Sequence, residues 1–377
     1  MSEIERRTPL YAEHESLGAR FVPYAGWRMP VQYRGVTEEH HAVRRAVGLF
    51  DVSHMGRLEV RGEGATPLID RLITNDLSKL ELGRALYTCC CNEAGGILDD
   101  LIVYRLAADR VLVICNAANR TKITAHVAAQ LAEHGRGRAE LVDVSDRTCL
   151  LAVQGPKALE LVTALGSQLS LPDALSSFSI RETRVMGVPC SLARTGYTGE
   201  DGVEIVCAVE DVVPLWRGLV ERGRSLGVEP VGLAARDTLR LEARLSLYGN
   251  EIDESTDPLE AGLGWTVKEA GRDFVGKTAI ALARQRGAHR QLVGFEMVGR
   301  GIARHGYRIM TPAGEPLGVC TSGAPSPTLG KNIGLGYVLV GHGSLGAELS
   351  VDCRGRAIPA RVVKTPFYRR PASPAKT

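Results

Sequence analysis

The chain has 377 residues, more than one hydrophobic core usually accommodates, which predicts two or three domains. Hydrophobic residues make up 44% and charged residues 24%, and the net charge of +3 comes without a long basic run. These values argue against a nucleic-acid partner, although a modest positive charge suits a small anionic ligand. No apolar run approaches the roughly 20 residues of a membrane span, so we expect no membrane association.

The N-terminus and the cysteines indicate a cytoplasmic protein. The first residues lack the apolar core of a signal peptide and include acids, which argues against a mitochondrial address. Nine cysteines are scattered without CxxC pairs, and Cys89, Cys90 and Cys91 are adjacent. Adjacent cysteines make a poor disulfide framework, and no paired ligand spacing predicts a zinc site. We therefore expect reduced, mostly buried thiols and no metal.

The predicted elements of the first 285 residues mix helices and strands. A helix begins near Leu10, after a Thr-Pro pair, and a second begins at Thr37, with acidic residues at its positive end. Strands are predicted at 57–60, 86–91, 96–106 and 111–115, followed by a helix over 117–134. Strands and helices then alternate to about residue 284, which predicts an α+β architecture.

The character of the chain changes after Gln291. Short apolar runs occur at 291–297, 306–310, 334–340 and 357–363, separated by clusters of Gly, Pro and Ser. This pattern predicts an all-β domain, a small barrel or jelly roll. We place the domain boundary near residue 285, so that 1–285 and 286–370 form separate regions, and expect an unstructured tail after it.

Two consecutive carboxylates lie in the strand predicted over 96–106, directly after a Gly-Gly pair. Strand alternation places Asp99 and Asp100 on opposite faces, each among apolar side chains, which implies a strand covered on both sides. For a single buried carboxylate, pairing with an arginine or capping a loop is the common explanation. Two in a row, after glycines that allow close backbone approach, favour a functional acid.

A further acid inside an apolar strand is Glu204, which shares a strand face with Val206 after a glycine-rich turn. Glu200 and Asp201, in that turn, are interpreted as solvent-exposed turn residues.

The segment 232–244 predicts a helix on which Arg236, Arg240 and Arg244 recur at four-residue spacing. A solvated charged stripe, supported by an Asp237–Arg240 pair, is the simpler interpretation. A row of like charges is slightly unfavourable, however, which leaves an anion-binding role open.

One ligand class would use all of these segments. A single buried carboxylate can bind the amidine-like edge of a pterin ring, the ring needs apolar or aromatic walls, and a glutamate tail attracts arginines. Composition alone does not select a folate.

The motifs do select one, because the chain resembles the glycine cleavage T-protein family from Arg7 to about Arg369. The matching stretches are 24–30 (YAGWRMP), 48–56 (GLFDVSHMG), 72–76 (LITND), 91–102 (CNEAGGILDDLI), 154–156 (QGP), 194–204 (RTGYTGEDGVE), 232–242 (GLAARDTLRLE), 247–250 (LYGN), 273–277 (DFVGK), 321–330 (TSGAPSPTLG) and 366–369 (PFYR). Each is moderately specific, and their number and order make the resemblance strong.

The resemblance implies an aminomethyltransferase. The family fold is a three-part cloverleaf around a central folate channel, with two intertwined α+β subdomains in 1–285 and an all-β C-terminal domain. The family takes the aminomethyl group from the lipoyl arm of H-protein, its partner. It transfers the one-carbon unit to tetrahydrofolate, the co-substrate, which gives 5,10-methylenetetrahydrofolate and ammonia and leaves dihydrolipoyl H-protein.

The resemblance also implies the site residues. Asp100 matches the catalytic aspartate. The residues expected to bind or surround the folate are Glu204, Tyr197, Arg236, Arg369, Asn116, Tyr87 and Met55. Leu245 stands where some members have a tyrosine, which puts the stacking near the folate in doubt.

Competing interpretations are weaker. Residues 271–278 match the phosphate-loop pattern GxxxxGK[ST], but Phe274 and Val275 are bulky where such a loop must fold closely around phosphates, so we expect a loop that caps a helix beginning near Gly276. Folate-dependent demethylases share the family fold, and those linked to amine oxidation usually carry a flavin domain for which this chain has no length. A non-catalytic folate-binding protein of iron–sulfur cluster maintenance would carry Lys-Gly-Cys where this chain has Asp273 to Lys277. His54 is interpreted as a packed or surface histidine, and Trp265 as either a channel wall or a buried structural residue.

Overall fold

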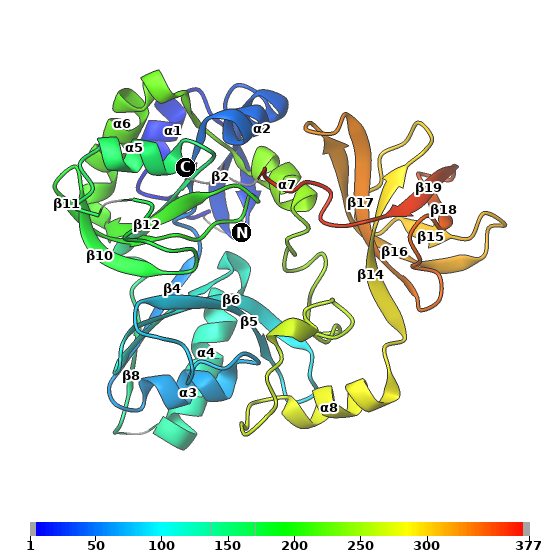
Figure 1. Ribbon diagram of the computed structural model, residues 1–377, viewed down its shortest axis with the longest axis horizontal. Helices are drawn as coiled ribbons and strands as arrows, with labels where there is room; N and C mark the ends of the chain where they lie inside the picture. Colours follow the sequence, from blue (N-terminus) through cyan, green and yellow to red (C-terminus); the bar gives the residue numbers. More distant parts are fainter. Residues whose placement is uncertain (1–4, 136, 170, 372–377) are drawn as a thin grey trace.

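The computed structural model describes residues 5–135, 137–169 and 171–371, which form three lobes around the centre of the molecule (Figure 1). Lobe 1 is at the upper left of Figure 1, lobe 2 lies below it, and the C-terminal barrel is on the right. The chain begins in lobe 1, forms lobe 2, returns to lobe 1, and then crosses a linking segment to the barrel. The predicted three-part α+β fold is confirmed. The predicted tail beyond residue 371 lies outside the described residues.

Lobe 1 is built on a six-stranded sheet in the order β10-β11-β12-β9-β3-β13. Its strands are β3 (Val47–Asp51), β9 (Thr148–Gln154), β10 (Ile180–Val185), β11 (Val188–Ala193), β12 (Gly202–Ala208) and β13 (Val228–Pro230). Around it lie the hairpin β1 (Arg20–Tyr24) and β2 (Trp27–Gln32), helices α1 (Tyr11–Ser16), α2 (Val36–Arg45), α5 (Ala158–Ala164), α6 (Val212–Arg222) and α7 (Leu233–Glu242), and the 3₁₀ turns η3 (Val209–Asp211) and η4 (Arg224–Leu226). Every residue of β3 is buried, as expected for an apolar run covered on both faces.

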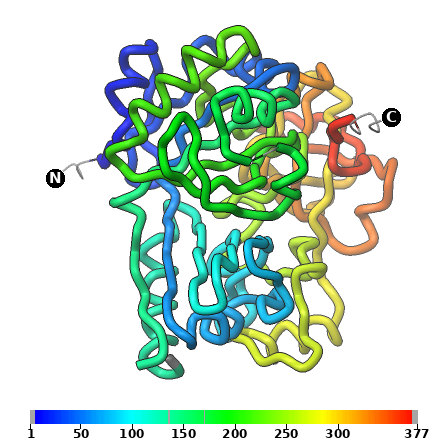
Figure 2. The backbone as a smooth tube through the Cα atoms, turned by 60° about the vertical axis from the view of Figure 1, so that its left-hand side comes forward, coloured from blue at the N-terminus to red at the C-terminus, as the bar shows by residue number. Residues whose placement is uncertain are grey.

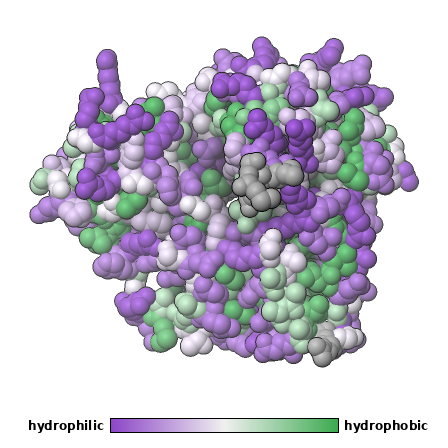
Figure 3. Space-filling model, turned by 180° about the vertical axis from the view of Figure 1, so that it is seen from behind, coloured by the Kyte–Doolittle hydropathy of each residue, from purple (hydrophilic) through white to green (hydrophobic). Residues whose placement is uncertain are grey.

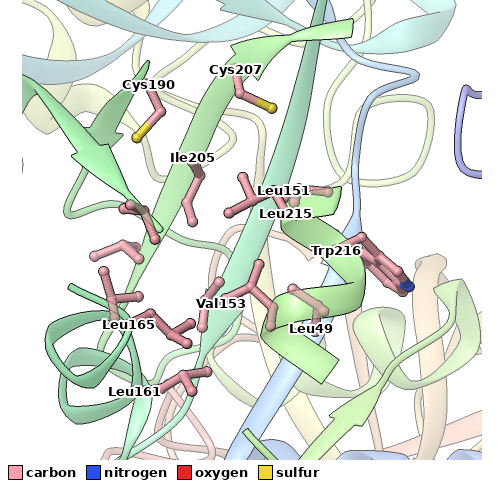
Figure 4. Close-up of a cluster of buried hydrophobic side chains, with 14 of the residues drawn as sticks. Leu49, Leu151, Val153, Leu161, Leu165, Cys190, Ile205, Cys207, Leu215 and Trp216 are labelled. Carbon is pink, nitrogen blue, oxygen red and sulfur yellow. The ribbon is translucent and has the colours of Figure 1, made fainter. Parts of the chain in front are cut away.

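The core of lobe 1 lies between this sheet and its helices (Figure 4). Leu151 and Val153 of β9 and Ile205 of β12 face Leu215 and Trp216 of α6. The N-terminal helix α1 packs on the same side, beside α6 (Figure 2), where the rings of His14 and Trp216 are 5.1 Å apart. Burial of such large side chains supplies most of the stabilisation of a domain of this size.

Lobe 2 is built on a five-stranded sheet in the order β5-β6-β7-β4-β8. Its elements are β4 (Gly56–Arg61), α3 (Ala65–Leu72), β5 (Arg84–Cys91), β6 (Ile97–Ala107), β7 (Arg110–Cys115), η1 (Ala117–Asn119), α4 (Arg120–Gln130), the π-helical turn η2 (Leu131–Gly135) and β8 (Glu140–Asp143). The single helix predicted over 117–134 is thus divided into a 3₁₀ turn, an α-helix and a π-helical turn. Cys89, Cys90 and Cys91 are buried in β5, as predicted, and all nine cysteines are free.

The two sheets share a hydrophobic cluster. Phe50 and Ala152 of lobe 1 belong to the same cluster as Leu112 and Ile114 of lobe 2. Strands from both lobes therefore face one interface, which is where the site described below opens.

The linking segment and the barrel complete the ring of lobes. The segment carries η5 (Gly264–Thr266) and α8 (Lys277–Arg286), and the closed barrel runs in the order β14-β17-β16-β15-β18-β19. The barrel strands are β14 (Arg290–Met297), β15 (Arg308–Met310), β16 (Pro316–Ser326), β17 (Lys331–Leu339), β18 (Glu348–Asp352) and β19 (Ala357–Val363). Along β19, buried and exposed residues alternate, as in a strand with one face toward a barrel interior.

The surface seen from behind is mostly hydrophilic, with small hydrophobic groups between the polar side chains (Figure 3). Within the described residues, no helix is long and apolar enough to cross a membrane.

Candidate active site

A cavity of about 480 Å³ opens between the two sheets and the chain that follows helix α7. All of the predicted site residues except Arg369 line it: Met55, Tyr87, Asp100, Asn116, Tyr197, Glu204 and Arg236. Lobe 2 supplies Tyr87 from β5, Asp100 from β6 and Asn116 after β7, while lobe 1 supplies Glu204 from β12 and Arg236 from α7. The fold thus gathers residues that are far apart in the sequence.

Asp99 and Asp100 are neighbours in β6, and Asn116 connects them. Its amide Nδ2 donates to Oδ1 of Asp99 and to Oδ1 of Asp100, each at 2.7 Å. Asp99 is fully buried and also accepts from Nδ2 of Asn119 at 2.6 Å, whereas Asp100 accepts from the Tyr87 hydroxyl at 3.0 Å and faces the cavity. Asp99 therefore orients the amide that holds Asp100.

Burial raises the pKa of both carboxyl groups, and for Asp99 the charge of Asp100 raises it further. Hydrogen bonds from Tyr87 and Asn116 partly oppose the shift at Asp100. A cavity carboxyl with a raised pKa can exchange a proton near neutral pH, which is the property that general acid–base chemistry needs.

Glu204 faces the cavity from lobe 1. Its Oε2 accepts a hydrogen bond from the Thr195 hydroxyl at 2.5 Å, and that hydroxyl lies 2.8 Å from the hydroxyl of Tyr104. In the described part of the chain, Oε1 has no hydrogen-bond partner, so half of this carboxylate is available to a ligand that donates hydrogen bonds.

Aromatic side chains form the cavity walls. The guanidinium of Arg236 lies over the Tyr197 ring at 4.6 Å from its centroid, and the Tyr197 hydroxyl donates to the backbone oxygen of Ser246. Tyr87 stacks on Trp265, with ring centroids 5.8 Å apart and an interplanar angle of 22°. Trp265 is 59% exposed and lines the cavity, so its interpretation as a channel wall is correct and the buried structural alternative is wrong.

Arg369 lies outside the cavity lining and is exposed after the end of β19. The reason is the anchoring of its neighbour, Tyr368, whose backbone N–H donates to the backbone oxygen of Glu242 at 2.9 Å. The guanidinium of Arg44 also packs over the Tyr368 ring, at 3.9 Å. The C-terminal segment is therefore attached to the end of α7 (Figure 1), and the cavity lining gives the predicted role of Arg369 no support.

The structure adds cavity residues that the sequence did not assign to the site, among them Tyr24, His54 and Phe178. Arg244, one of the arginines for which an anion-binding role was left open, also lines the cavity. His54 is 4% exposed, and burial together with the charge of Arg236 lowers its pKa to about 3, so its imidazole is neutral. The sequence could have placed His54 in the site, because it is next to Met55 in the motif 48–56. Its interpretation as a packed or surface histidine did not take this position into account.

Two sequence interpretations are wrong because they assumed exposure. The Glu200 side chain is 4% exposed and lies 2.9 Å from Nη1 of Arg44, and Asp201 is 2.6 Å from Nη2 of Arg194. Arg240 is 1% exposed and pairs with Glu251 at 2.6 Å, so the arginines of 232–244 do not form a solvated stripe. Helix α7 is covered by both lobe 1 and the barrel, which no local pattern shows.

The segment 271–278 caps a helix, as predicted. Helix α8 begins at Lys277, Gly276 precedes it in a left-handed conformation, and the Lys277 ammonium donates to the backbone oxygen of Arg272. Phe274 and Val275 are buried in the core, so this loop is not folded around a phosphate site.

Comparisons with known proteins identify the family. The family model described as the GCVT N-terminal domain matches residues 10–270, and the glycine cleavage T-protein C-terminal barrel domain matches residues 290–369. The aminomethyltransferase of Symbiobacterium thermophilum is 50% identical over 374 residues, covering 98% of this chain and 99% of that protein. The aminomethyltransferase of Geobacillus thermodenitrificans is 47% identical over 370 residues, covering 98% and 100%.

A solved structure is also similar over almost the whole chain. The crystal structure of glycine cleavage system aminomethyltransferase T from Bartonella henselae has a TM-score of 0.90 and 35% sequence identity, covering 97% of this chain and 99% of that one. Family models, full-length relatives and fold agree, and the chain belongs to the glycine cleavage T-protein family and is an aminomethyltransferase.

Proposed function

We propose that the enzyme transfers the one-carbon unit of an S-aminomethyldihydrolipoyl arm, carried by H-protein, to tetrahydrofolate. The products are 5,10-methylenetetrahydrofolate, ammonia and dihydrolipoyl H-protein. The protons lost from N5 and N10 of the folate balance those gained by ammonia and by the thiol. The relatives are aminomethyltransferases, which supports the transferred group, and the family supports the two partners.

The observation that carries this proposal is the convergence of two different carboxylates on one cavity. Glu204 has a carboxylate oxygen available for the donor edge of a pterin, and Asp100 faces the cavity from the other sheet. In the proposed complex, Asp100 hydrogen-bonds the folate near its reacting amines and handles their protons as N5 attacks the aminomethyl carbon.

The walls support the same ligand. A cavity of about 480 Å³ is within the usual range for small-molecule sites. Tyr197 with Arg236 on one side, and Tyr87 with Trp265 on the other, offer stacking surfaces for an aromatic ligand. We further propose a cytoplasmic location, which the nine free cysteines support, with no metal, nucleic acid or membrane in the reaction.

The decisive experiment supplies the purified enzyme with tetrahydrofolate and aminomethyl-loaded H-protein, and follows ammonia and 5,10-methylenetetrahydrofolate. Product that depends on both substrates is expected. If folate binds but no product forms, the proposed reaction is wrong, and a folate-dependent demethylase or a non-catalytic folate-binding protein becomes the better assignment.

A further inference from the structure

The cavity lining includes non-glycine residues with a left-handed backbone conformation. Five described non-glycine residues have positive φ, and three of these line the cavity: Ala25, Phe178 and Arg244. Arg244, with φ of 57°, is the charged member of this group and follows Ala243, the C-cap of helix α7. Its backbone N–H donates to the backbone oxygen of Leu241, and the N–H of Leu245 donates to that of Arg240, so the left-handed conformation belongs to a Schellman motif that ends the helix. This motif fixes the backbone of Arg244 at the cavity wall.

The Arg244 guanidinium has no hydrogen bond or ion pair with any described residue. Arg240, one helical turn earlier, instead reaches Glu251, Asp237 and the Ser322 hydroxyl. Arg244 lies against Gly262, where an added Cβ would come within 2.7 Å of its Nη2. Burial lowers the pKa of Arg244, and interactions with Tyr337, Glu251 and Tyr87 only partly oppose this effect.

The Arg244 guanidinium lines the cavity, is half-buried and has no acceptor among the described residues, so its N–H donors are available to a ligand that brings an anion. Since a guanidinium carries only donors, it cannot bind the donor edge of a pterin, which suits the carboxylate of Glu204 instead. Its natural partner is an acceptor, and a carboxylate matches its planar fork.

We propose that Arg244 binds a carboxylate of the glutamate tail of the folate. This inference rests on the proposed function, in which the tail is the anionic part of the two substrates, because the reacting end of the lipoyl arm carries an amine. Arg236 then packs on the Tyr197 ring of the cavity wall. Arg244 provides a second cationic group for the ligand, near Gly262 and Tyr87.

The test compares two ligands by isothermal titration calorimetry: 5-formyltetrahydrofolate and 5-formyltetrahydropteroate, which lacks the glutamate. We expect Arg244→Gln to weaken binding of the first by about 10- to 100-fold and to leave binding of the second unchanged. Arg244→Lys, which keeps the charge without the fork, is expected to lose less. The matched control is Arg222→Gln, on the exposed face of α6 and outside the cavity, which removes the same charge and is expected to change neither affinity.

Arg244→Gly separates ligand contact from a structural role. Glycine accepts positive φ, so this variant is expected to keep or raise Tm while losing the same affinity for 5-formyltetrahydrofolate. An equal loss for both ligands, an unchanged affinity for both, or a fall in Tm that parallels the loss would overturn the role of Arg244. A wild-type enzyme that binds neither ligand would overturn the proposed function itself.

Discussion

Two regions of this molecule contain buried charges, and the charges are fully paired in one region and incompletely paired in the other. Where α7 meets the barrel, Glu242 is fully buried and accepts from Arg44, from the hydroxyl of Ser326 and from the hydroxyl of Thr328. In the cavity on the other side of the same helix, Arg244 has no partner in the described chain, and one oxygen of Glu204 accepts no hydrogen bond there.

This difference distinguishes charges that hold the lobes together from charges that are available to bind a ligand. A buried charge whose hydrogen bonds are complete contributes to a unique arrangement and has no capacity left for substrate. A buried charge that is incompletely paired lowers the stability of the free enzyme, and a ligand that completes its hydrogen bonds offsets this loss. Replacing members of the first set should therefore change stability, and replacing members of the second should change binding or turnover.

The largest expected effect is at Asp100. Asp100→Asn keeps the shape of the side chain but removes its capacity to take up a proton, so kcat should fall on the order of 10³-fold while folate affinity stays within a few-fold. Steady-state kinetics together with calorimetric titration measure both quantities. Parallel loss of turnover and affinity would show that Asp100 holds the folate and does not act in the chemical step.

The next largest effect is expected in the paired region for Glu242→Gln, which removes one of the two carboxylates that the buried Arg44 contacts and leaves Glu200. The free energy of unfolding should fall by about 3 kcal/mol, measured by urea denaturation. The control is Glu296→Gln, which breaks an exposed pair with Lys331 and should cost well under about 1 kcal/mol. Equal effects of the two variants would contradict the comparison.

The same variant has a defined pH dependence. Burial by itself would raise the pKa of Glu242, but hydrogen bonds from His40, Ser326 and Arg44 lower it to about 2. A depressed carboxyl pKa contributes stability above the unfolded value of 4.5, and this contribution is lost as pH falls toward 2. The stability difference between wild type and Glu242→Gln should therefore shrink over that interval.

A smaller effect is expected at Glu204. Glu204→Gln removes the charge that would bind the donor edge of a pterin, so folate affinity should fall by about 10- to 100-fold. The kcat at saturating folate should change little, because the proposed chemistry takes place at Asp100. Calorimetry and a folate saturation series measure these quantities, and an unchanged affinity would remove Glu204 from the site.

The last prediction concerns the stability of Asp100→Asn. Burial raises the pKa of Asp100 above its ordinary value of 3.8, so the unfolded chain ionises first and folding loses stability as pH rises from there to the folded pKa. The variant should be more stable than wild type at pH 7, and equal to it near pH 4. A variant less stable at pH 7 would show that the hydrogen bonds of Asp100 outweigh its desolvation.

Much of the site could be predicted because its signals are local. Two consecutive acids in an apolar strand singled out Asp99 and Asp100, and a charge inside another apolar strand singled out Glu204. Partners that are distant in sequence could not be predicted in this way. Glu200 looked like a turn residue because Arg44, its partner, is 156 positions away, and Arg240 looked exposed because the barrel that covers α7 lies later in the chain. The domain boundary at residue 285 stays a prediction.

By itself, the sequence determined the elements, the faces of the strands, the β-rich C-terminal region and, through its motifs, the family. Strand faces and helix periods are encoded by neighbouring residues, so they can be read without a structure. No local pattern divided the body into two lobes, which only the family resemblance implied, because β3 pairs with β9 across the whole of lobe 2, with Gly48 opposite Gln154. Only the tertiary structure decided which charges are paired and which face the cavity, since desolvation and pairing depend on what every lobe brings to the same place.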